Sequence, residues 1–221
     1  MVKLVAITQG SGELVNKTAQ EVVAYVTRVS NPNNQLNFDT APKLLAYCIK
    51  NQHWSPFEHA FFTVEIVTSR GIAAQVLRHR SFTFQEFSQR YSTANSYIQY
   101  EARRQDVKNR QNSIDDIEQQ DKDWFKQAQE QVWELSNNLY QEALNKQIAK
   151  EQARFLLPLN TETKIYMTGS IRSWIHYCQL RCDKATQKEH RDIADGCKQI
   201  FSENFPDIAK ALGWLSDEQA Q

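Results

Sequence analysis

Lysine and arginine together number 26 in this chain of 221 residues, and aspartate and glutamate also number 26, so the formal net charge is zero. This balance argues against a general binder of nucleic-acid polymers or membrane surfaces, because such proteins usually carry a strong basic excess. No stretch approaches the roughly 20 apolar residues of a membrane span, and the first residues lack the architecture of a signal peptide. We therefore expect a cytoplasmic protein, acting in the host cytoplasm if a virus or phage encodes it.

The length predicts a single domain over residues 1–221, able to bury roughly 70% of its unfolded surface without a disulfide or metal staple. The four cysteines are Cys48, Cys178, Cys182 and Cys197, and all lie in helical patterns. None forms a Cys-x2-Cys pair, so we predict reduced thiols and no metal site.

Apolar periodicity and capping residues predict the elements of the first half of the chain. In chain order they are a strand over 3–8, a helix over 18–28, a polar loop over 31–39, a helix over 40–51, a strand over 60–68 and a helix over 72–80. Phe62, Val64 and Ile66 alternate with their neighbours, which is typical of a strand with one buried face. In the last helix Gln75 and Arg78 are three residues apart and share a face.

The second half is predicted to be mostly helical. The expected elements are an irregular variable segment over 95–120 that overlaps the start of a long helix over 115–146, a helix over 148–157, a strand over 161–168, helices over 170–182 and 185–203, and a frayed tail after 215. The long helix carries an apolar stripe at helical spacing, which we interpret as buried core; its members are Trp124, Ala128, Val132, Leu135 and Leu139. With no alternation of strand and helix typical of βαβ units and no Gly-x-Gly-x-x-Gly, the chain is predicted to mix helices and strands without a Rossmann fingerprint.

The most informative segment runs from Arg78 to Tyr91, with the sequence RHRSFTFQEFSQRY. A buried core would not tolerate so many charges, and a solvated face would not need its four aromatic residues. Between Arg70 and Arg104 there are six arginines against two glutamates. Because arginine grips phosphate through a planar fork, this mixture indicates an anionic ligand with flat rings, such as a nucleotide or a flavin.

The same segment resembles the signature of the flavin-dependent thymidylate synthases, the ThyX family. That signature reads Arg-His-Arg, two free positions, Ser, a free position, Asn or Gln, Glu, a free position, Ser, a free position, Arg-Tyr. Thr83 stands where most members have Ser and keeps the hydroxyl; every other specified position fits. The resemblance implies an α+β fold with an antiparallel or mixed sheet flanked by long helices, assembled as a homotetramer with FAD between subunits.

The resemblance also implies roles for the signature residues. Those expected to contact FAD are Arg78, His79, Arg80 and Glu86. Those expected to hold the substrate dUMP are Gln75, Arg78, Glu86, Ser88, Gln89 and Arg90. Ser88 and Arg90 suit a phosphate on chemical grounds as well.

A second cluster, His53 to His59, reads HWSPFEH. From residue types alone it is most simply a loop whose histidines are hydrogen-bonded, and the spacing does not favour a metal site. It resembles the family's His-x-Ser/Thr-Pro-Phe-Glu-His segment, which implies that Ser55 touches FAD while His53 and Glu58 line the same pocket.

Two later segments complete the resemblance. The run from Ala153 to Leu159 is similar to the family's second dUMP segment, which implies that Arg154 reaches the nucleotide. Within Gly169–Arg181, the match implies that FAD is contacted by Ser170, Ile171, Arg172 and His176, and that Arg181 meets the uracil. Helical geometry agrees, because Arg172 and His176 share one face and Arg181 lies about half a turn away from Arg172. Some members have Asn at 170 or 176, and His176 could instead be a structural histidine.

The family route needs no protein nucleophile, and none of the four cysteines is among the residues expected to contact FAD or dUMP. NADPH reduces FAD, methylenetetrahydrofolate donates the carbon, and the protein positions and polarises the substrate. Arg181 is the predicted catalytic residue, stabilising negative charge that develops on the uracil. Two alternatives stay open: a single-stranded nucleic-acid module that stacks bases on its aromatics, and a flavoprotein of the same fold with another pyrimidine or no methyl donor.

Overall fold

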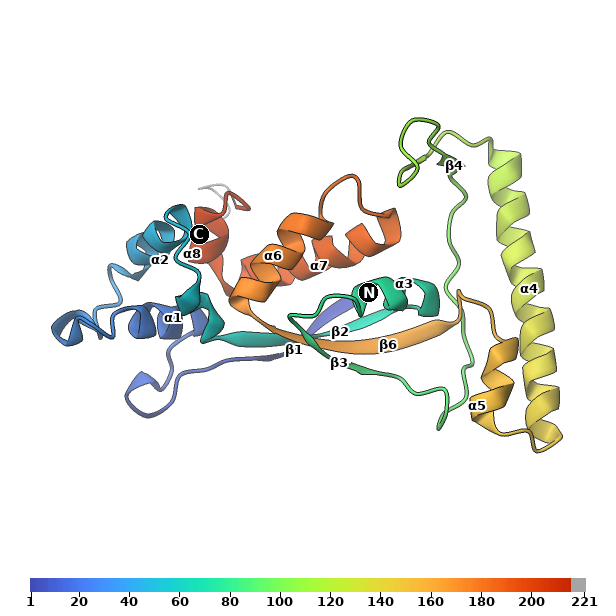
Figure 1. Cartoon of the computed structure of the whole chain (residues 1–221), viewed down its shortest axis with the longest axis horizontal. Helices are drawn as coiled ribbons and strands as arrows, with labels where there is room; N and C mark the ends of the chain where they lie inside the picture. The colour runs from blue at the N-terminus through green and yellow to red at the C-terminus, as the bar shows by residue number, and fades with distance from the viewer. Residues whose placement is uncertain (216–221) are drawn as a thin grey trace.

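The computed structural model describes residues 1–215, which form a four-stranded antiparallel sheet, helices on one side of it, and a projecting helical arm (Figure 1). The sheet has the order β1-β2-β6-β3, and a separate two-stranded hairpin, β4-β5, lies between β3 and β6 in the chain. The strands are β1 (Val2–Ile7), β2 (Phe61–Ser69), β3 (Thr83–Glu86), β4 (Arg104–Gln105), β5 (Ser113–Ile114) and β6 (Glu162–Ser170). The helices are α1 (Ala19–Thr27), α2 (Ala41–Lys50), α3 (Arg70–Val76), α4 (Gln119–Asn145), α5 (Lys150–Ala153), α6 (Ile171–Arg181), α7 (Lys188–Asn204) and α8 (Pro206–Ala211). Four short 3-10 turns are η1 (Gly12–Leu14), η2 (Pro32–Asn34), η3 (Ser55–Glu58) and η4 (Arg154–Leu156).

The two central strands pair along their full length, from Phe61 opposite Ser170 to Ser69 opposite Glu162. Alternate residues of β2 are buried, among them Phe62, Val64 and Ile66, because that face receives the helices. The other face is polar and partly open. There Tyr166 donates to Glu65 at 3.0 Å, and Lys164 pairs with the same carboxylate at 3.2 Å.

Aromatic side chains fill the core between the sheet and α6. The rings of Phe62 and Trp174 stack with centroids 4.4 Å apart, and the Trp174 indole donates to the Phe62 carbonyl at 3.2 Å. Phe201 and Phe205 pack against the same Phe62 ring. Trp174 is fully buried and its indole N–H is hydrogen-bonded, so it fixes α6 on the sheet. Helix α6 carries several of the predicted site residues.

Helix starts follow the capping signals in the sequence. Thr18 and Glu21 form a reciprocal capping box at the start of α1. The Ser170 side chain accepts from the Ser173 backbone N–H at 3.3 Å at the start of α6. The predictions for α1, α2, α6 and the strands β1, β2 and β6 are confirmed to within one or two residues.

Other predictions were wrong in detail. The helix predicted over 72–80 is α3, which starts at Arg70 and ends at Val76, since the chain must turn there to place β3 beside β6. Arg78 therefore lies beyond the helix and does not share a helical face with Gln75. The predicted helix over 148–157 is the short α5 followed by η4, and the segment 95–120 contains the β4–β5 hairpin. The tail after 215 lies outside the described residues.

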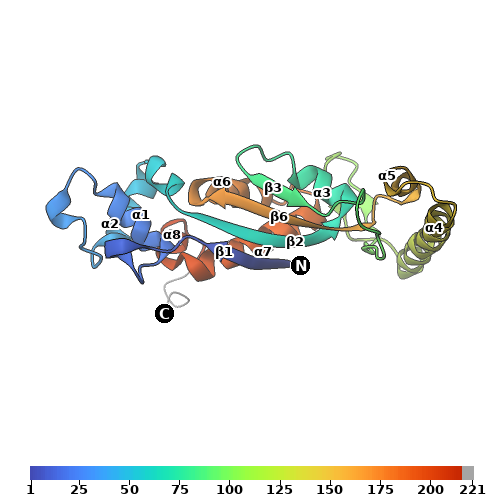
Figure 2. The same cartoon turned by 90° about the horizontal axis from the view of Figure 1, so that it is seen from below.

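Helices α4 and α5 form an arm beside the end of the sheet, and both views show it standing away from α1, α2 and α8 (Figures 1 and 2). Its own small core consists of Tyr140, Ala143 and Ala153 with Leu144 and Leu157. The apolar stripe was predicted to be buried, and that prediction was wrong for this chain alone: Trp124 is 66% exposed and Leu135 63% exposed. The helical spacing was right, but no other part of the described chain packs on that face.

Within residues 1–215, we find no helix with both the length and the apolar character needed to cross a membrane.

Candidate active site

The first part of the signature forms a turn between α3 and β3, and the second part forms β3 itself. Three backbone contacts shape the turn, including Phe82 N–H to the His79 carbonyl at 3.2 Å. The Phe82 ring lies directly on Gly169 of β6, where a Cβ atom would come within 2.5 Å of it. The glycine thus lets the signature approach the sheet, and Arg78 and Arg80 remain exposed. Neither arginine has an ion-pair partner within the part of the chain that the structure describes.

A cavity of about 530 Å³ lies beside this turn, where η3 meets α6. It gathers three of the predicted site residues, Glu58, Arg172 and His176, from two segments more than a hundred positions apart in the sequence. The remaining lining residues are Trp54, Ser81, Ser173, Ile175 and Gln179. An aromatic ring, aliphatic carbon, a cation and amide and imidazole groups therefore face one space.

Glu58 links two other residues at this cavity. One carboxylate oxygen accepts from the Ser170 hydroxyl at 2.5 Å and the other accepts from Arg172 at 3.0 Å. Since Ser170 also caps α6 and is 3% exposed, its side chain is committed to the protein. Ile171 is fully buried, so its side chain does not line the cavity either. Ser55 and His53 are exposed beyond its edge, and His53 packs edge-on against Tyr47.

His79 joins the signature to the far end of α6. The Arg181 Nε–H donates to His79 Nε2 at 2.9 Å, so that imidazole nitrogen must be unprotonated. Burial, followed by the nearby Arg181 guanidinium and His176 imidazole, lowers the pKa of His79 to about 4. Tyr177 and His190 pack edge-on against the ring. At neutral pH His79 is therefore a fixed acceptor that orients Arg181.

Glu86 lies at the end of β3 in a second polar group. Its carboxylate accepts from Arg70 at 2.6 Å and from the Thr163 hydroxyl at 3.0 Å. These partners come from α3 and β6, so the position of Glu86 is fixed by two neighbouring elements.

A third group forms where the turn after β3 approaches α5. The Ser88 hydroxyl accepts from the Arg90 backbone N–H at 3.3 Å, and the Arg90 side chain lies 3.4 Å from the Glu151 carboxylate. Arg154 donates to the Glu151 backbone carbonyl at 3.2 Å. Gln89 is 5% exposed, and its amide nitrogen has no hydrogen-bond partner in the described chain. Two arginines from separate segments thus converge on one corner.

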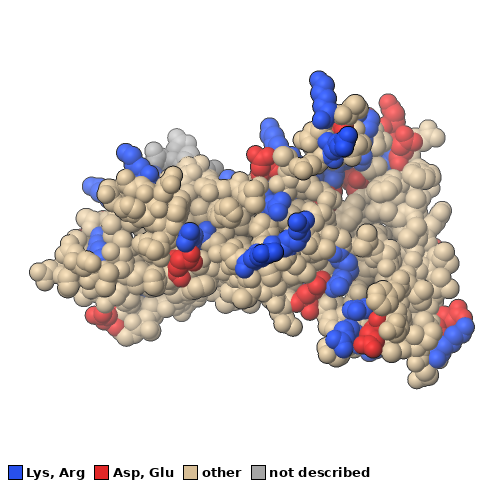
Figure 3. Space-filling view, in the orientation of Figure 1, with Lys and Arg blue, Asp and Glu red and all other residues tan. Residues whose placement is uncertain are grey.

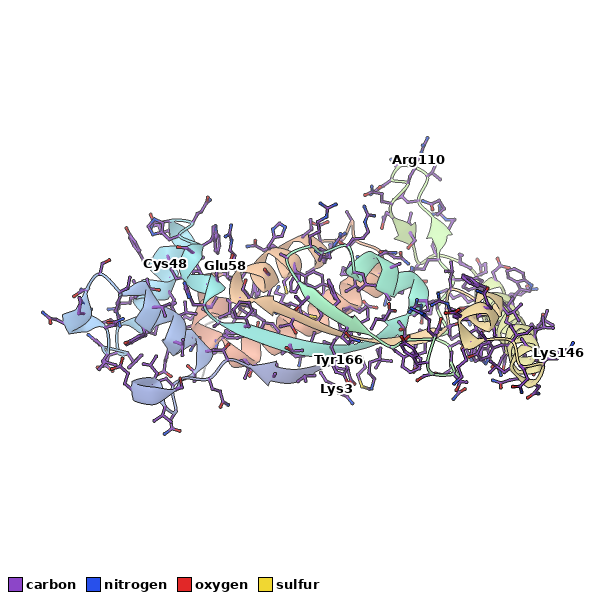
Figure 4. The ribbon with its side chains drawn as sticks, turned by 60° about the horizontal axis from the view of Figure 1, so that its bottom comes forward. Lys3, Cys48, Glu58, Arg110, Lys146 and Tyr166 are labelled. Carbon is purple, nitrogen blue, oxygen red and sulfur yellow. The ribbon has the colours of Figure 1, made fainter. Side chains whose placement is uncertain are left out.

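Within one chain, the structure places the predicted site residues in separate groups and not in a single pocket. The residues at 58, 172 and 176 share the cavity, His79 and Arg181 meet at the other end of α6, and Arg90 and Arg154 meet beside α5. The arm that carries this last corner and the labelled Glu58 lie at opposite ends of the sheet (Figure 4). Gln75 bonds to Gln187 at 2.7 Å, away from the cavity.

Several residues at these sites were missed from the sequence. Ile175 and Gln179 follow Arg172 by three and seven positions, so the helical spacing of α6 already placed them on its ligand face. Arg70, Thr163 and Gln187 carried no comparable signal, because each is recruited through a tertiary contact.

Comparison with known proteins agrees with the resemblance. The chain matches the family model described as Thymidylate synthase complementing protein over residues 13–207. It is 57% identical over 214 residues to a probable flavin-dependent thymidylate synthase of Paramecium bursaria Chlorella virus 1, covering 96% of this chain and 99% of that protein. It is 60% identical over 193 residues to a flavin-dependent thymidylate synthase of Synechocystis sp., covering 87% and 89%.

The fold also matches a solved structure. A UMP/dUMP methylase from Streptomyces cacaoi, crystallised with 5-Br dUMP, superposes with a TM-score of 0.81 over 96% of this chain and 94% of its own. Sequence identity is 22%, so this likeness bears on the fold alone.

Proposed function

The chain belongs to the family of flavin-dependent thymidylate synthases, and from this premise we propose that it converts dUMP to dTMP by reductive methylation. FAD is the proposed cofactor, NADPH and methylenetetrahydrofolate are the proposed co-substrates, and the proposed location is the cytoplasm. The observation that carries the proposal is the cavity in which Glu58, Arg172 and His176 meet beside the signature turn.

The donor set of this cavity fits FAD. Trp54 and Ile175 offer apolar surface to a flat ring, while Arg172 and the exposed Arg78 and Arg80 offer charge to a pyrophosphate. Figure 3 shows a group of lysine and arginine side chains, in blue, near the middle of the face in view, with no red acidic side chain among them. Bound FAD supplies hydride chemistry once it is reduced. The roles proposed for Ser170 and Ile171 then fall to their backbone atoms, since both side chains are buried.

We assign dUMP to the signature strand and the arginine corner. Arg90 and Arg154 converge near Ser88, which suits the phosphate group. The unpartnered amide of Gln89 is a buried donor that a phosphate or sugar oxygen would satisfy. Glu86, held by Arg70 and Thr163, presents a fixed acceptor beside them.

Arg181 is the proposed catalytic residue. His79 occupies its Nε–H, which leaves the two terminal amino groups of the guanidinium for the uracil carbonyl and its developing negative charge. Three of the four cysteines, Cys48, Cys178 and Cys197, are buried and unsuited to nucleophilic attack. Burial raises the pKa of the Cys48 and Cys197 thiols, and a hydrogen bond with the Cys182 thiol, followed by burial, raises the pKa of Cys178.

We further propose a homotetramer with active sites shared between subunits. Three features support it: the exposed apolar stripe of α4, the uncovered face of the sheet, and the separation of the cavity from the arginine corner. A partner's arginine corner placed at this cavity would complete the site.

The test is dTMP formation by purified protein supplied with dUMP, methylenetetrahydrofolate, NADPH and FAD, omitting each component in turn. Product that vanishes without FAD supports the proposal. Protein that retains yellow flavin but forms no dTMP would support the cofactor site and show that the substrate is not dUMP. Oligonucleotide binding with steep salt dependence, and no flavin, would favour the nucleic-acid module instead.

A further inference from the structure

The β4–β5 hairpin belongs to the segment that matched no motif, yet it connects to a predicted substrate residue through an unbroken chain of hydrogen bonds. Arg103, immediately before β4, donates through Nε to the Ser113 hydroxyl of β5 at 2.9 Å. Its Nη2 donates to the Glu189 carboxylate of α7. The Gln187 amide nitrogen donates to the other Glu189 oxygen at 2.8 Å, and the Gln75 amide nitrogen donates to the Gln187 carbonyl oxygen at 2.7 Å. We call Arg103, Glu189, Gln187 and Gln75 the amide relay.

The charged end of the relay is well buried. The side chains of Arg103 and Glu189 are 13% and 11% exposed. Burial pushes the pKa of Glu189 upward, but hydrogen bonds from Arg103, from its own backbone N–H and from Gln187 outweigh burial, so the pKa lies below its ordinary value. Glu189 also occupies the first turn of α7, where the helix dipole favours an anion. The carboxylate is therefore ionised and can only accept hydrogen bonds.

That constraint fixes the direction of both amides. A guanidinium only donates and a carboxylate only accepts, so Gln187 must turn its NH2 group toward Glu189. The side-chain carbonyl oxygen of Gln187 then faces Gln75 and can only accept a hydrogen bond. Gln75 must therefore donate to it through its own NH2 group. An inverted Gln75 would set two carbonyl oxygens against each other. Charge at the hairpin thus determines which way the Gln75 amide points.

From this geometry we propose that Arg103, Glu189 and Gln187 are positioning residues that hold the Gln75 amide in one orientation for dUMP. The inference rests on the proposed function, because it takes Gln75 to contact the nucleotide. The side-chain carbonyl oxygen of Gln75 has no partner within residues 1–215 and stays available as an acceptor. The ring N–H and the sugar hydroxyl of dUMP are donors that match it. The hairpin, whose tip carries Arg110 in Figure 4, then serves to supply Arg103.

The test measures dUMP binding to the FAD-loaded protein by titration calorimetry. Gln187→Met keeps the size of the side chain and leaves the Arg103–Glu189 ion pair intact, but it removes the link to Gln75. We expect dUMP to bind about tenfold more weakly with the melting temperature unchanged, as for the loss of one oriented hydrogen bond. Asp192→Asn is the matched control: it removes the Asp192–Lys188 ion pair on the same helix, outside the relay, and leaves dUMP affinity at the wild-type value.

A double variant separates positioning from general support. If the relay acts through Gln75, Gln187→Met adds nothing in a Gln75→Met background, and both single variants and the double variant share one affinity. If the losses of dUMP affinity were additive, so that the double variant bound dUMP about a hundredfold more weakly, the proposed relay would be wrong. Unchanged dUMP affinity in Gln187→Met would also overturn it. Wild-type protein that retains FAD but binds no dUMP would instead overturn the proposed function, and the relay with it.

Discussion

The two ends of the sheet differ in how much of their packing comes from the same chain. Around α6, buried aromatic residues hold the helix, and the polar residues at its ends have internal partners: Glu58 holds Ser170 and Arg172, and Arg181 holds His79. Around α4 and α5, the apolar stripe is exposed and the Arg90–Arg154 corner is open. We therefore interpret the α6 end as a rigid wall of the proposed cofactor site, and the arm as the surface that a second subunit of the proposed assembly would complete.

The largest expected effect comes from Arg181, the proposed catalytic residue at the α6 end. Arg181→Ala should lower kcat by about 100- to 1,000-fold, the usual cost of removing a preorganised group that stabilises developing charge. Bound flavin should remain near the wild-type content, because Arg181 does not line the cavity. Steady-state dTMP assays and the flavin absorbance per subunit measure the two quantities. Lys184→Ala, an exposed cation just beyond α6, is the control.

Loss of flavin in Arg181→Ala would contradict the separation between the cavity and the catalytic arginine. It would mean that the two ends of α6 serve one ligand.

The next effect tests the open end. Leu135→Arg places a charge in the exposed stripe of α4 and should dissociate the assembly, since a buried unpaired charge costs several kcal/mol at an interface. We expect about 100-fold less turnover at micromolar protein, with subunits that stay folded. Sedimentation velocity and circular dichroism check this, with the neighbouring exposed change Glu134→Gln as control. A variant that keeps its mass and its activity would show that the stripe is not an interface.

The same contrast explains which features could be predicted from the sequence. Phe62 and the stripe residue Leu135 both fit apolar patterns, but periodicity indicates only which residues share a face, not what covers that face. What covers an apolar face depends on tertiary and quaternary contacts. Helices of the same chain cover the face of Phe62, so its burial was predicted correctly, whereas nothing in the described chain covers Leu135, so the prediction that it is buried was wrong. The motif match named Glu58, Arg172 and His176, which the structure places around one cavity, whereas no sequence pattern pointed to Gln187, which contacts Gln75.

A smaller effect is expected at Glu58 of the cavity. Glu58→Gln removes the charge that pairs with Arg172 and turns one accepting oxygen into a donor, so Arg172 and the cap of α6 lose their fixed geometry. We expect FAD affinity to fall about tenfold, with fold stability changed by less than about 1 kcal/mol because the ion pair is largely exposed. Flavin fluorescence titration measures the affinity. Glu65→Gln removes a comparable ion pair on the open sheet face and should leave FAD binding unchanged.

Equal flavin affinity in Glu58→Gln and wild type would remove Glu58 from the cofactor site. A fall in both variants would point to a general loss of sheet stability.

The smallest effect concerns a buried residue that packs against His79. His190 is fully buried, and neither ring nitrogen has a partner within the described chain. Such unsatisfied atoms cost about 1–3 kcal/mol each, so His190→Leu should be at least as stable as wild type at pH 7 by urea unfolding. A less stable variant would show that the ring nitrogens are hydrogen-bonded in the assembled protein.

The pH dependence of unfolding sharpens this last prediction. Burial lowers the pKa of His190 to about 4, with the charges of Arg181 and His79 acting in the same direction, and His79 itself has a pKa of about 4. In the unfolded chain both titrate near about 6.5. The unfolded state therefore binds more protons between these values, and stability falls as pH drops from 6.5 toward 4. His190→Leu removes one of the two contributions, so its advantage over wild type should widen by about 2–3 kcal/mol at pH 4.5. A constant gap across this range would mean that His190 titrates in the folded protein as it does in the unfolded one.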